Sequence, residues 1–529
     1  MKNTLRNILL GGLAVTMIAS CDLNLVPTDS IVYEEGTPLL LTQRDIAEFQ
    51  NGVLASYRGL HYGSAWQTVE VMTDCFNATV DFGNNYGFVH RLGSGFLASD
   101  SYTTGIWAGH YSAIKNYNIA IEQCGLVTEE ALIENANILK GMALFCRASS
   151  YLTLVRAFAA NYDPATATTQ LGVPLILKYD QLEKPVRATV KEVYDQIFKD
   201  LDEAELLLEE ASVNGSIILN GNPTDGTLDL AGQPRAMAPT VDAVKALKAR
   251  YYLDIEDYDN AASYAMDVID SEAGYALSAS LQEMENEFMT DTGNESIIRL
   301  FATPSEGAVG CTIFTSVNST DNEGKFFSPL FIPSQTLVNA YNNSDLRKQT
   351  WLPVDMYPVK VQGTLYNGIA MFTKFIGNPS LQQGNNEDGA HYCKPLMISE
   401  MYLIAAEAYA QAGNEGDAET ILKELKTARK AGDMTGTIME EVKLEWLRET
   451  IGEGQRINCI KRWGDGLGAR PAQRAAENIV MNTPVTDYTG RELAADAHTL
   501  VWPIPSYEIK IAPGLVQNPG YSAEYFLKL

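Results

Sequence analysis

Apolar residues recur every three or four positions through most of this chain of 529 residues. That spacing places apolar side chains on one face of an α-helix, and few stretches show the two-residue alternation of a half-buried strand. The helical pattern covers residues 43–60, 107–124, 129–160, 189–211, 240–254, 257–271, 397–412, 415–431 and 438–451. The sequence therefore predicts a mainly α protein. Long irregular segments, rich in Gly, Asn and aromatic residues, are expected at 75–106, 213–238 and 273–395.

Two of the predicted helical pairs look like copies of one unit. Residues 252–261 align with residues 409–418, with Tyr at one end and Ala at the other. Small residues within the helices and Gly or Asp in the turn are typical of the helix-turn-helix unit of tetratricopeptide repeats. We expect such pairs to form a scaffold; two unrelated amphipathic hairpins are the alternative.

The start of the chain has the features of a bacterial lipoprotein signal. Lys2 and Arg6 precede an apolar stretch that is too short to span a bilayer, which takes about 20 apolar residues. The sequence Ile-Ala-Ser-Cys ending at Cys21 is similar to a lipobox. We therefore expect residues 1–20 to be a cleaved signal peptide and Cys21 to be the lipid attachment site. An ordinary signal peptide with an accidental cysteine is the alternative.

Beyond the signal, the chain is predicted to form one body. Residues 21–38 are polar and have no helical period, which is typical of a short tether. The remaining residues contain no other segment that approaches a membrane span. We expect residues 39–529 to form a single domain, with an N-terminal part at about 39–215 and a C-terminal part at about 240–529.

Charge and motif content argue against several classes of function. The formal net charge is −27, and such a surface repels nucleic acid. No Cys-x-x-Cys or zinc-type pair is present and the five histidines lack ligand spacing, so we expect no metal, no cofactor and no redox site. The cysteines other than Cys21 are predicted to be mostly free, buried thiols. Protease, hydrolase and phosphate-loop motifs are missing from the sequence, so no enzyme activity is predicted.

Several motifs occur in an order that resembles one known family. The early helix contains Trp107, Tyr111 and Asn118, and a second helix follows at 140–158. Next come Gly-Val-Pro-Leu at 172–175 and a helix start at 187–194. Near the end lie Arg448-Glu449, Gly-Glu-Gly-Gln-Arg at 452–456, Lys-Arg-Trp-Gly at 461–464, Pro-Ile-Pro at 503–505 and Gln-Asn-Pro-Gly-Tyr at 517–521. In this order, and behind a lipobox, the motifs resemble the SusD/RagB family of surface lipoproteins. Gln455 is a departure, since many members have histidine there.

The resemblance implies a fold, a location and a function. The fold would be SusD-like, with tetratricopeptide-like helix pairs as scaffold and long irregular loops forming the ligand face. The protein would be lipid-anchored in the cell outer membrane and exposed at the surface. It would bind a glycan or a related nutrient, such as a peptide, and deliver it to a partner SusC-like TonB-dependent transporter. The alternative is an adhesin-like surface protein whose helical repeats bind another protein.

Two of the irregular segments, residues 74–91 and 341–375, are rich in groups that bind sugars. Aromatic faces stack on the apolar face of a sugar, while carboxylates, amides and arginine hydrogen-bond its hydroxyls. Ordinary long loops that are held in place by their aromatic residues are the alternative. We predict ligand contacts by five residues in regions expected to lie outside the core: Asp74, Asn77, Tyr86, Arg91 and Trp351.

Overall fold

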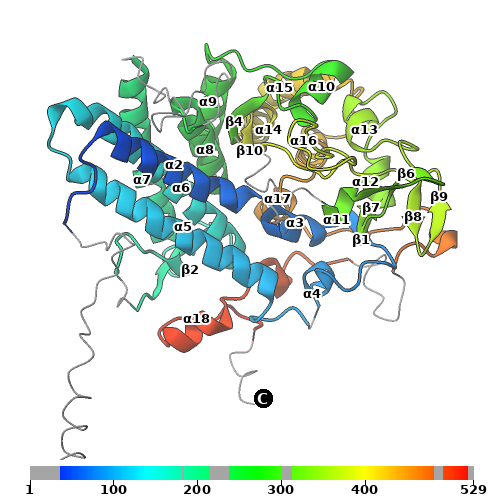
Figure 1. Ribbon diagram of the computed structural model, residues 1–529, viewed down its shortest axis with the longest axis horizontal. Helices are drawn as coiled ribbons and strands as arrows, with labels where there is room; N and C mark the ends of the chain where they lie inside the picture. Colours follow the sequence, from blue (N-terminus) through cyan, green and yellow to red (C-terminus); the bar gives the residue numbers. More distant parts are fainter. Residues whose placement is uncertain are drawn as a thin grey trace, which may run out of the picture.

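The structure, a computed structural model, describes residues 36–62, 64–93, 95–180, 184–213, 238–300, 302, 312–481 and 492–521. The predicted signal peptide, Cys21 and most of the predicted tether lie outside these described residues. Among the described residues, helices predominate and strands are short, so the predicted mainly α fold class is confirmed (Figure 1).

Four long helices form one side of the molecule (Figure 1). They are α2 (Gln43–His61), α5 (Ser101–Gly125), α6 (Glu130–Phe158) and α7 (Val190–Val213). Helix α6 packs against the other three, and most of its residues from Ile138 to Phe158 are buried. Contrary to the expectation that no further segment approaches a membrane span, this helix is apolar and long enough to cross a membrane, but 89% of its most apolar window is buried inside the protein. It is therefore the central helix of the core.

Two helical hairpins confirm the predicted repeat. The first joins α8 (Val241–Asp254) to α9 (Tyr258–Ile269), and the second joins α14 (Ile398–Gln411) to α15 (Glu415–Arg429). The two turns share an equivalent backbone hydrogen bond. Asp257 N donates to Tyr252 O at 3.0 Å in the first turn, and Asn414 N donates to Tyr409 O at 2.8 Å in the second. Helices α9 and α14 also pack on each other, so the two hairpins form a continuous scaffold.

The second half of the chain places short elements against this scaffold. Helices α16 (Ile438–Glu449) and α17 (Arg456–Trp463) lie close to α14, and α3 (Ser64–Val71) lies beside α17 in Figure 1. The smaller helices are α4 (Gly87–Arg91), α10 (Leu281–Phe288), α11 (Thr312–Thr315), α12 (Gln335–Asn339), α13 (Leu346–Trp351) and α18 (Ser506–Ile511).

The strands form small sheets. β1 (Phe76–Ala78) pairs antiparallel with β7 (Phe331–Pro333), and β4 (Ser296–Leu300) pairs antiparallel with β10 (Cys393–Met397). β2 (Leu171–Pro174) pairs with β3 (Arg187–Thr189). A four-stranded sheet lies at the far end of the molecule from α5 and α6: β5 (Val317–Thr320), β6 (Gly324–Phe327), β8 (Val359–Val361) and β9 (Thr364–Tyr366).

The segment 273–395, which was predicted to be irregular, contains short helices and strands between its loops. Its strands are three to five residues long, which is too short for two-residue alternation to be visible in the sequence. The segment is also held by the core. One buried apolar cluster runs from Leu40 to Ile504, and a smaller one packs under the four-stranded sheet.

The cysteines agree with their prediction where the structure describes them. Cys75, Cys124, Cys146, Cys393 and Cys459 are free and buried. Burial raises the pKa of the Cys459 thiol to about 11, so that thiol is protonated and unreactive at neutral pH. The described residues hold no cluster of His, Cys, Asp or Glu that fits a metal ion.

Candidate functional site

Asp74, the first residue predicted to contact ligand, forms an ion pair inside the protein. Its carboxylate accepts hydrogen bonds from Arg456 Nε at 3.1 Å and Nη2 at 2.8 Å. Burial would raise the pKa of Asp74, but the charge of Arg456 and its hydrogen bonds hold that pKa below the usual value. The side chain is 8% exposed and it fixes the first turn of α17.

Asn77 and Tyr86 are also buried, which corrects the prediction that they lie outside the core. Asn77 lies in β1 opposite Ile332 and is fully buried, because both faces of β1 are buried. Tyr86 is 6% exposed; its ring stacks on Tyr102 at 3.9 Å, and its hydroxyl donates to Gln67 at 3.2 Å. Arg91 is half-buried, donates to Asn84 at 3.1 Å and lies over the ring of Phe88.

Trp351 is a core residue as well, and its predicted accessibility was wrong. It ends α13 with 1% exposure, and its ring packs edge-on against Phe288. The Lys374 ammonium lies 4.0 Å from the centre of the indole ring. The sequence does not reveal this burial, because α13 has only six residues and is too short to show a helical period.

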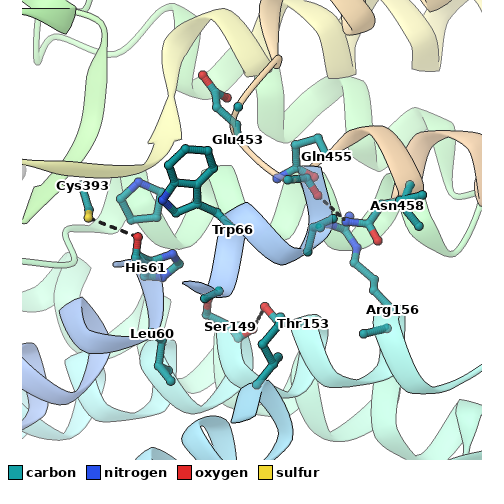
Figure 2. Close-up of a pocket in the computed structure, with 18 of the residues that line it drawn as sticks. Leu60, His61, Trp66, Ser149, Thr153, Arg156, Cys393, Glu453, Gln455 and Asn458 are labelled. Carbon is teal, nitrogen blue, oxygen red and sulfur yellow. Dashed lines mark hydrogen bonds between the residues drawn. The ribbon is translucent and has the colours of Figure 1, made fainter. Parts of the chain in front are cut away.

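A cavity of about 170 Å³ lies where α2 ends, between α3, α6 and α17 (Figure 2). The lining also includes residues of α5, α8 and β10 and of the loop that joins α16 to α17. None of the five predicted contact residues lines it, although Asp74 supports α17 directly behind it. A cavity of roughly 150 Å³ accommodates benzene, so this volume accommodates one six-membered ring.

Histidines supply the most unusual polar atoms of the cavity. His61 Nε2 and His110 Nδ1 are buried and have no hydrogen-bond partner among the described residues. Burial lowers the pKa of His61 to about 3 and that of His110 to about 4. Burial, aided by Lys394, also lowers the pKa of His391 to about 4. All three imidazoles are therefore neutral at pH 7, and His391 Nδ1 already donates to the Gly389 carbonyl at 2.8 Å.

Neutral hydroxyls and amides complete the polar lining. Ser149 and Thr153 come from successive turns of α6, and Thr153 Oγ1 donates to the Ser149 carbonyl at 3.0 Å. Asn458 projects from α17, and Gln455 immediately precedes that helix (Figure 2). Thr153, Gln455 and Asn458 are only half-buried, so their polar atoms are available to a ligand.

Aromatic rings form the apolar wall. Trp66 of α3 is half-buried and occupies the centre of the view in Figure 2. Phe314 stacks behind it at 5.8 Å and Phe375 packs edge-on at 5.6 Å, so the indole is held in one orientation. Phe375 in turn stacks on His391 at 4.6 Å. A fixed indole beside neutral polar groups suits the stacking of a flat, hydroxylated ring.

The charged residues of the lining all have partners on their outer side. Arg156 grips Asp254 with Nε at 2.5 Å and Nη2 at 2.7 Å. Arg250 forms the same two-point contact with Glu400, to which its Nε donates at 2.7 Å and its Nη2 at 2.6 Å. Lys394 pairs with Asp291, and Glu453 accepts from Lys374 Nζ at 2.6 Å. Each charged residue of the lining is therefore paired with a residue of opposite charge outside the lining.

Glu70 supports the loop between α16 and α17. Its Oε1 accepts from Gly454 N at 2.8 Å, while its buried Oε2 has no partner among the described residues. Burial raises the pKa of Glu70 to about 7, and the backbone of Gly454 and Gly452 opposes that rise. This carboxyl holds the two loop glycines, which line the cavity.

Sequence analysis missed this site because its residues come from widely separated segments. Three of the five histidines meet here from α2, α5 and the segment before β10. They are far apart in the sequence, so their spacing does not indicate a shared site. The sequence signal was Trp66, an aromatic residue on a short helix next to the predicted loop. What the arrangement offers chemically is a polar pocket whose charged residues are all paired and which has one aromatic wall.

Comparison with known proteins shows similarity over most of the chain. Residues 29–219 match a family described as starch-binding and associating with the outer membrane. Residues 318–521 match the SusD family. By sequence, no curated protein is a match.

Solved structures share the fold. A SusD superfamily protein from Bacteroides thetaiotaomicron is 22% identical, with a TM-score of 0.71 over 90% of this chain and 99% of its own. A SusD superfamily protein from Bacteroides vulgatus is 21% identical, with a TM-score of 0.68 over 90% and 99%. A SusD-like carbohydrate binding protein from the same species is 17% identical, with a TM-score of 0.65 over 89% and 97%.

Proposed function

The chain belongs to the SusD/RagB family, and from that premise we propose that it is a surface lipoprotein that binds a glycan and passes it to a transporter. The observation that carries the binding role is the cavity beside Trp66. It combines a fixed aromatic ring with uncharged imidazoles, hydroxyls and amides. Sugars present one apolar face and many hydroxyls, which are the groups such a site satisfies.

Similar proteins support this assignment. The matched family is described as starch-binding, and one structural neighbour is described as carbohydrate binding. Within the proposal, Asp74 and Trp351 support the site from behind: Asp74 through Arg456 of α17, and Trp351 through Lys374, which pairs with Glu453 of the lining. Direct contact of Asp74, Asn77, Tyr86, Arg91 or Trp351 with a ligand stays a prediction.

Delivery completes the proposed role. Acylated Cys21 would anchor the body to the cell outer membrane through the tether, because two or more acyl chains hold a protein stably at a bilayer. A SusC-like TonB-dependent transporter in the same membrane would then receive the glycan. The support for this step is the description of the matched family as associating with the outer membrane.

A glycan array tests the binding role, and copurification tests delivery. The purified mature protein is expected to bind one glycan class with dissociation constants in the range that calorimetry measures. Absence of binding to every glycan class, by array and by calorimetry, would remove the proposal. Detergent extracts should yield a large outer-membrane transporter together with the tagged protein, and extracts of a Cys21→Ser strain should yield less of it.

A further inference from the structure

The charges around the cavity determine which glycans can enter it. Arg156, Arg250 and Lys394 are the cations of the lining, and each already holds a carboxylate on its outer side. Two of the pairs are two-point contacts between a guanidinium and a carboxylate, the strongest geometry for such groups. A negatively charged ligand would have to compete for a cation that is already neutralised.

Competition of this kind is costly. Asp254 has 8% side-chain exposure and Glu400 has 3%. If a ligand carboxylate drew Arg250 away, the buried Glu400 would lose its paired cation, which is strongly unfavourable. If it drew Arg156 away, Asp254 would keep only the longer contact with Arg462, at 3.8 Å, as an ion pair. Glu453, the one acidic residue of the lining, is likewise neutralised by its buried partner Lys374.

The uncharged groups of the lining can bind a ligand hydroxyl without breaking an ion pair. His61 and His110 line the same space, and their unsatisfied Nε2 and Nδ1 atoms are buried in its wall. Their low pKa values keep both rings uncharged, so they do not attract an anion either. Thr153 and Asn458 add further uncharged groups beside them.

We infer that this cavity selects uncharged sugars and rejects hexuronates and other acidic glycans. The inference rests on the proposed function and narrows its substrate class. It follows from the pairing of every charged lining residue and from the uncharged, half-buried side chains of Thr153, Gln455 and Asn458 beside them. The ring that enters would lie against Trp66, with its hydroxyls facing α5, α6 and α17.

Paired glycans test the selection. The probes are oligosaccharides of glucose, galactose and mannose, each with its counterpart oxidised at C6 to the uronate, titrated into the mature protein. The neutral member of the bound pair is expected to bind at least tenfold more tightly than its uronate. Equal or tighter binding of the uronate would overturn the inference while leaving the proposed function intact.

Matched variants tie that preference to the cavity. Thr153→Val and Asn458→Ala each remove one uncharged polar group and should weaken binding of the neutral glycan about fivefold or more. Two variants away from the cavity are the controls. Thr420→Val, at an exposed position of α15, removes a hydroxyl that makes the same bond as that of Thr153, to the carbonyl four residues back. Asn116→Ala removes an exposed amide of α5, and both controls should bind like the parent. If the cavity variants also bind like the parent, the glycan binds elsewhere and the inference fails. If no glycan binds at all, the proposed function fails first.

Discussion

Glu256 and Gly413 occupy the same position in the two helical hairpins, and both adopt left-handed backbone angles, with φ of 63° and 81°. Each residue ends the first helix of its hairpin. In both turns the next residue donates its N–H to a tyrosine carbonyl five residues earlier. A left-handed residue at this position is the usual way to end a helix, and glycine adopts it without strain.

This equivalence predicts opposite effects of two substitutions. Glu256→Gly should stabilise the protein by about 1 kcal/mol, because a side chain in the left-handed region costs roughly 1–2 kcal/mol. Gly413→Ala should destabilise it by a similar amount, since an added Cβ meets open space and only the backbone angle opposes it. Chemical denaturation measures both. A destabilised Glu256→Gly would show that the exposed glutamate has a role beyond the turn.

Truncation of Trp351 should affect folding. The side chain is 1% exposed, and replacing a buried Trp by Ala costs about 3–5 kcal/mol. We expect Trp351→Ala to lower the melting temperature strongly, whereas Trp351→Phe should cost less because it keeps a ring below Lys374. A melting temperature equal to that of the parent would contradict the packing described for α13.

Asp74→Ala should act through Arg456. The variant leaves a mostly buried guanidinium without its carboxylate, and breaking such a pair costs about 3 kcal/mol or more. Asp195→Ala is the control, since Asp195 forms an exposed pair with Lys191 at 2.7 Å and such pairs contribute little. Equal melting temperatures for the two variants would mean that the Asp74 pair does not hold α17 in place.

The buried histidines predict a loss of stability in mild acid. His110 is neutral in the folded protein down to about pH 4, whereas the unfolded chain takes up a proton below about pH 6.5. Stability therefore falls as the pH falls from 6.5 toward 4, by up to about 2 kcal/mol at pH 5 for this residue. His110→Gln should flatten the dependence of melting temperature on pH between 7.5 and 5. Exposed His498→Gln is the control and should leave that dependence unchanged.

The sequence was sufficient to predict the long helices, because each has a wide apolar face whose three- and four-residue spacing is visible along the chain. The stretch 415–431 became α15 at Glu415–Arg429, and the stretch 240–254 became α8 at Val241–Asp254. Short elements gave no such signal. β1 is a three-residue strand that is buried on both faces, so its sequence does not differ from that of a loop and does not reveal that Asn77 is buried. The aromatic-rich segment 74–91 was expected to lie at the surface, but the rings of Phe76, Phe82 and Tyr86 are buried in the core.

The cavity could not be predicted from local sequence patterns for a different reason. His61, Ser149 and Asn458 meet only after α2, α6 and α17 have packed together, and each is unremarkable in its own stretch of sequence. The pairing of Arg156 with Asp254 joins residues 98 positions apart. Long-range contacts of this kind follow from the tertiary fold, so the polarity and charge balance of the site became visible only there.

The proposed anchor has a direct test in cells. Cys21→Ser should abolish labelling with radioactive palmitate and release the protein from the membrane fraction. Cys311→Ser, elsewhere in the chain, should keep both the label and the membrane association. Retention of label by the Cys21 variant would contradict lipid attachment at this residue.

Calorimetric titration of Trp66→Ala with the glycan selected on the array tests the central claim most directly. A ring that stacks on a sugar contributes on the order of 1–2 kcal/mol, so the variant should bind about five- to thirtyfold more weakly. Trp66→Phe keeps a flat ring and should retain part of the affinity. The melting temperature of each variant must be measured alongside, since Trp66 also packs on Phe314. Parent-like affinity in a folded Trp66→Ala protein would contradict glycan binding in this cavity.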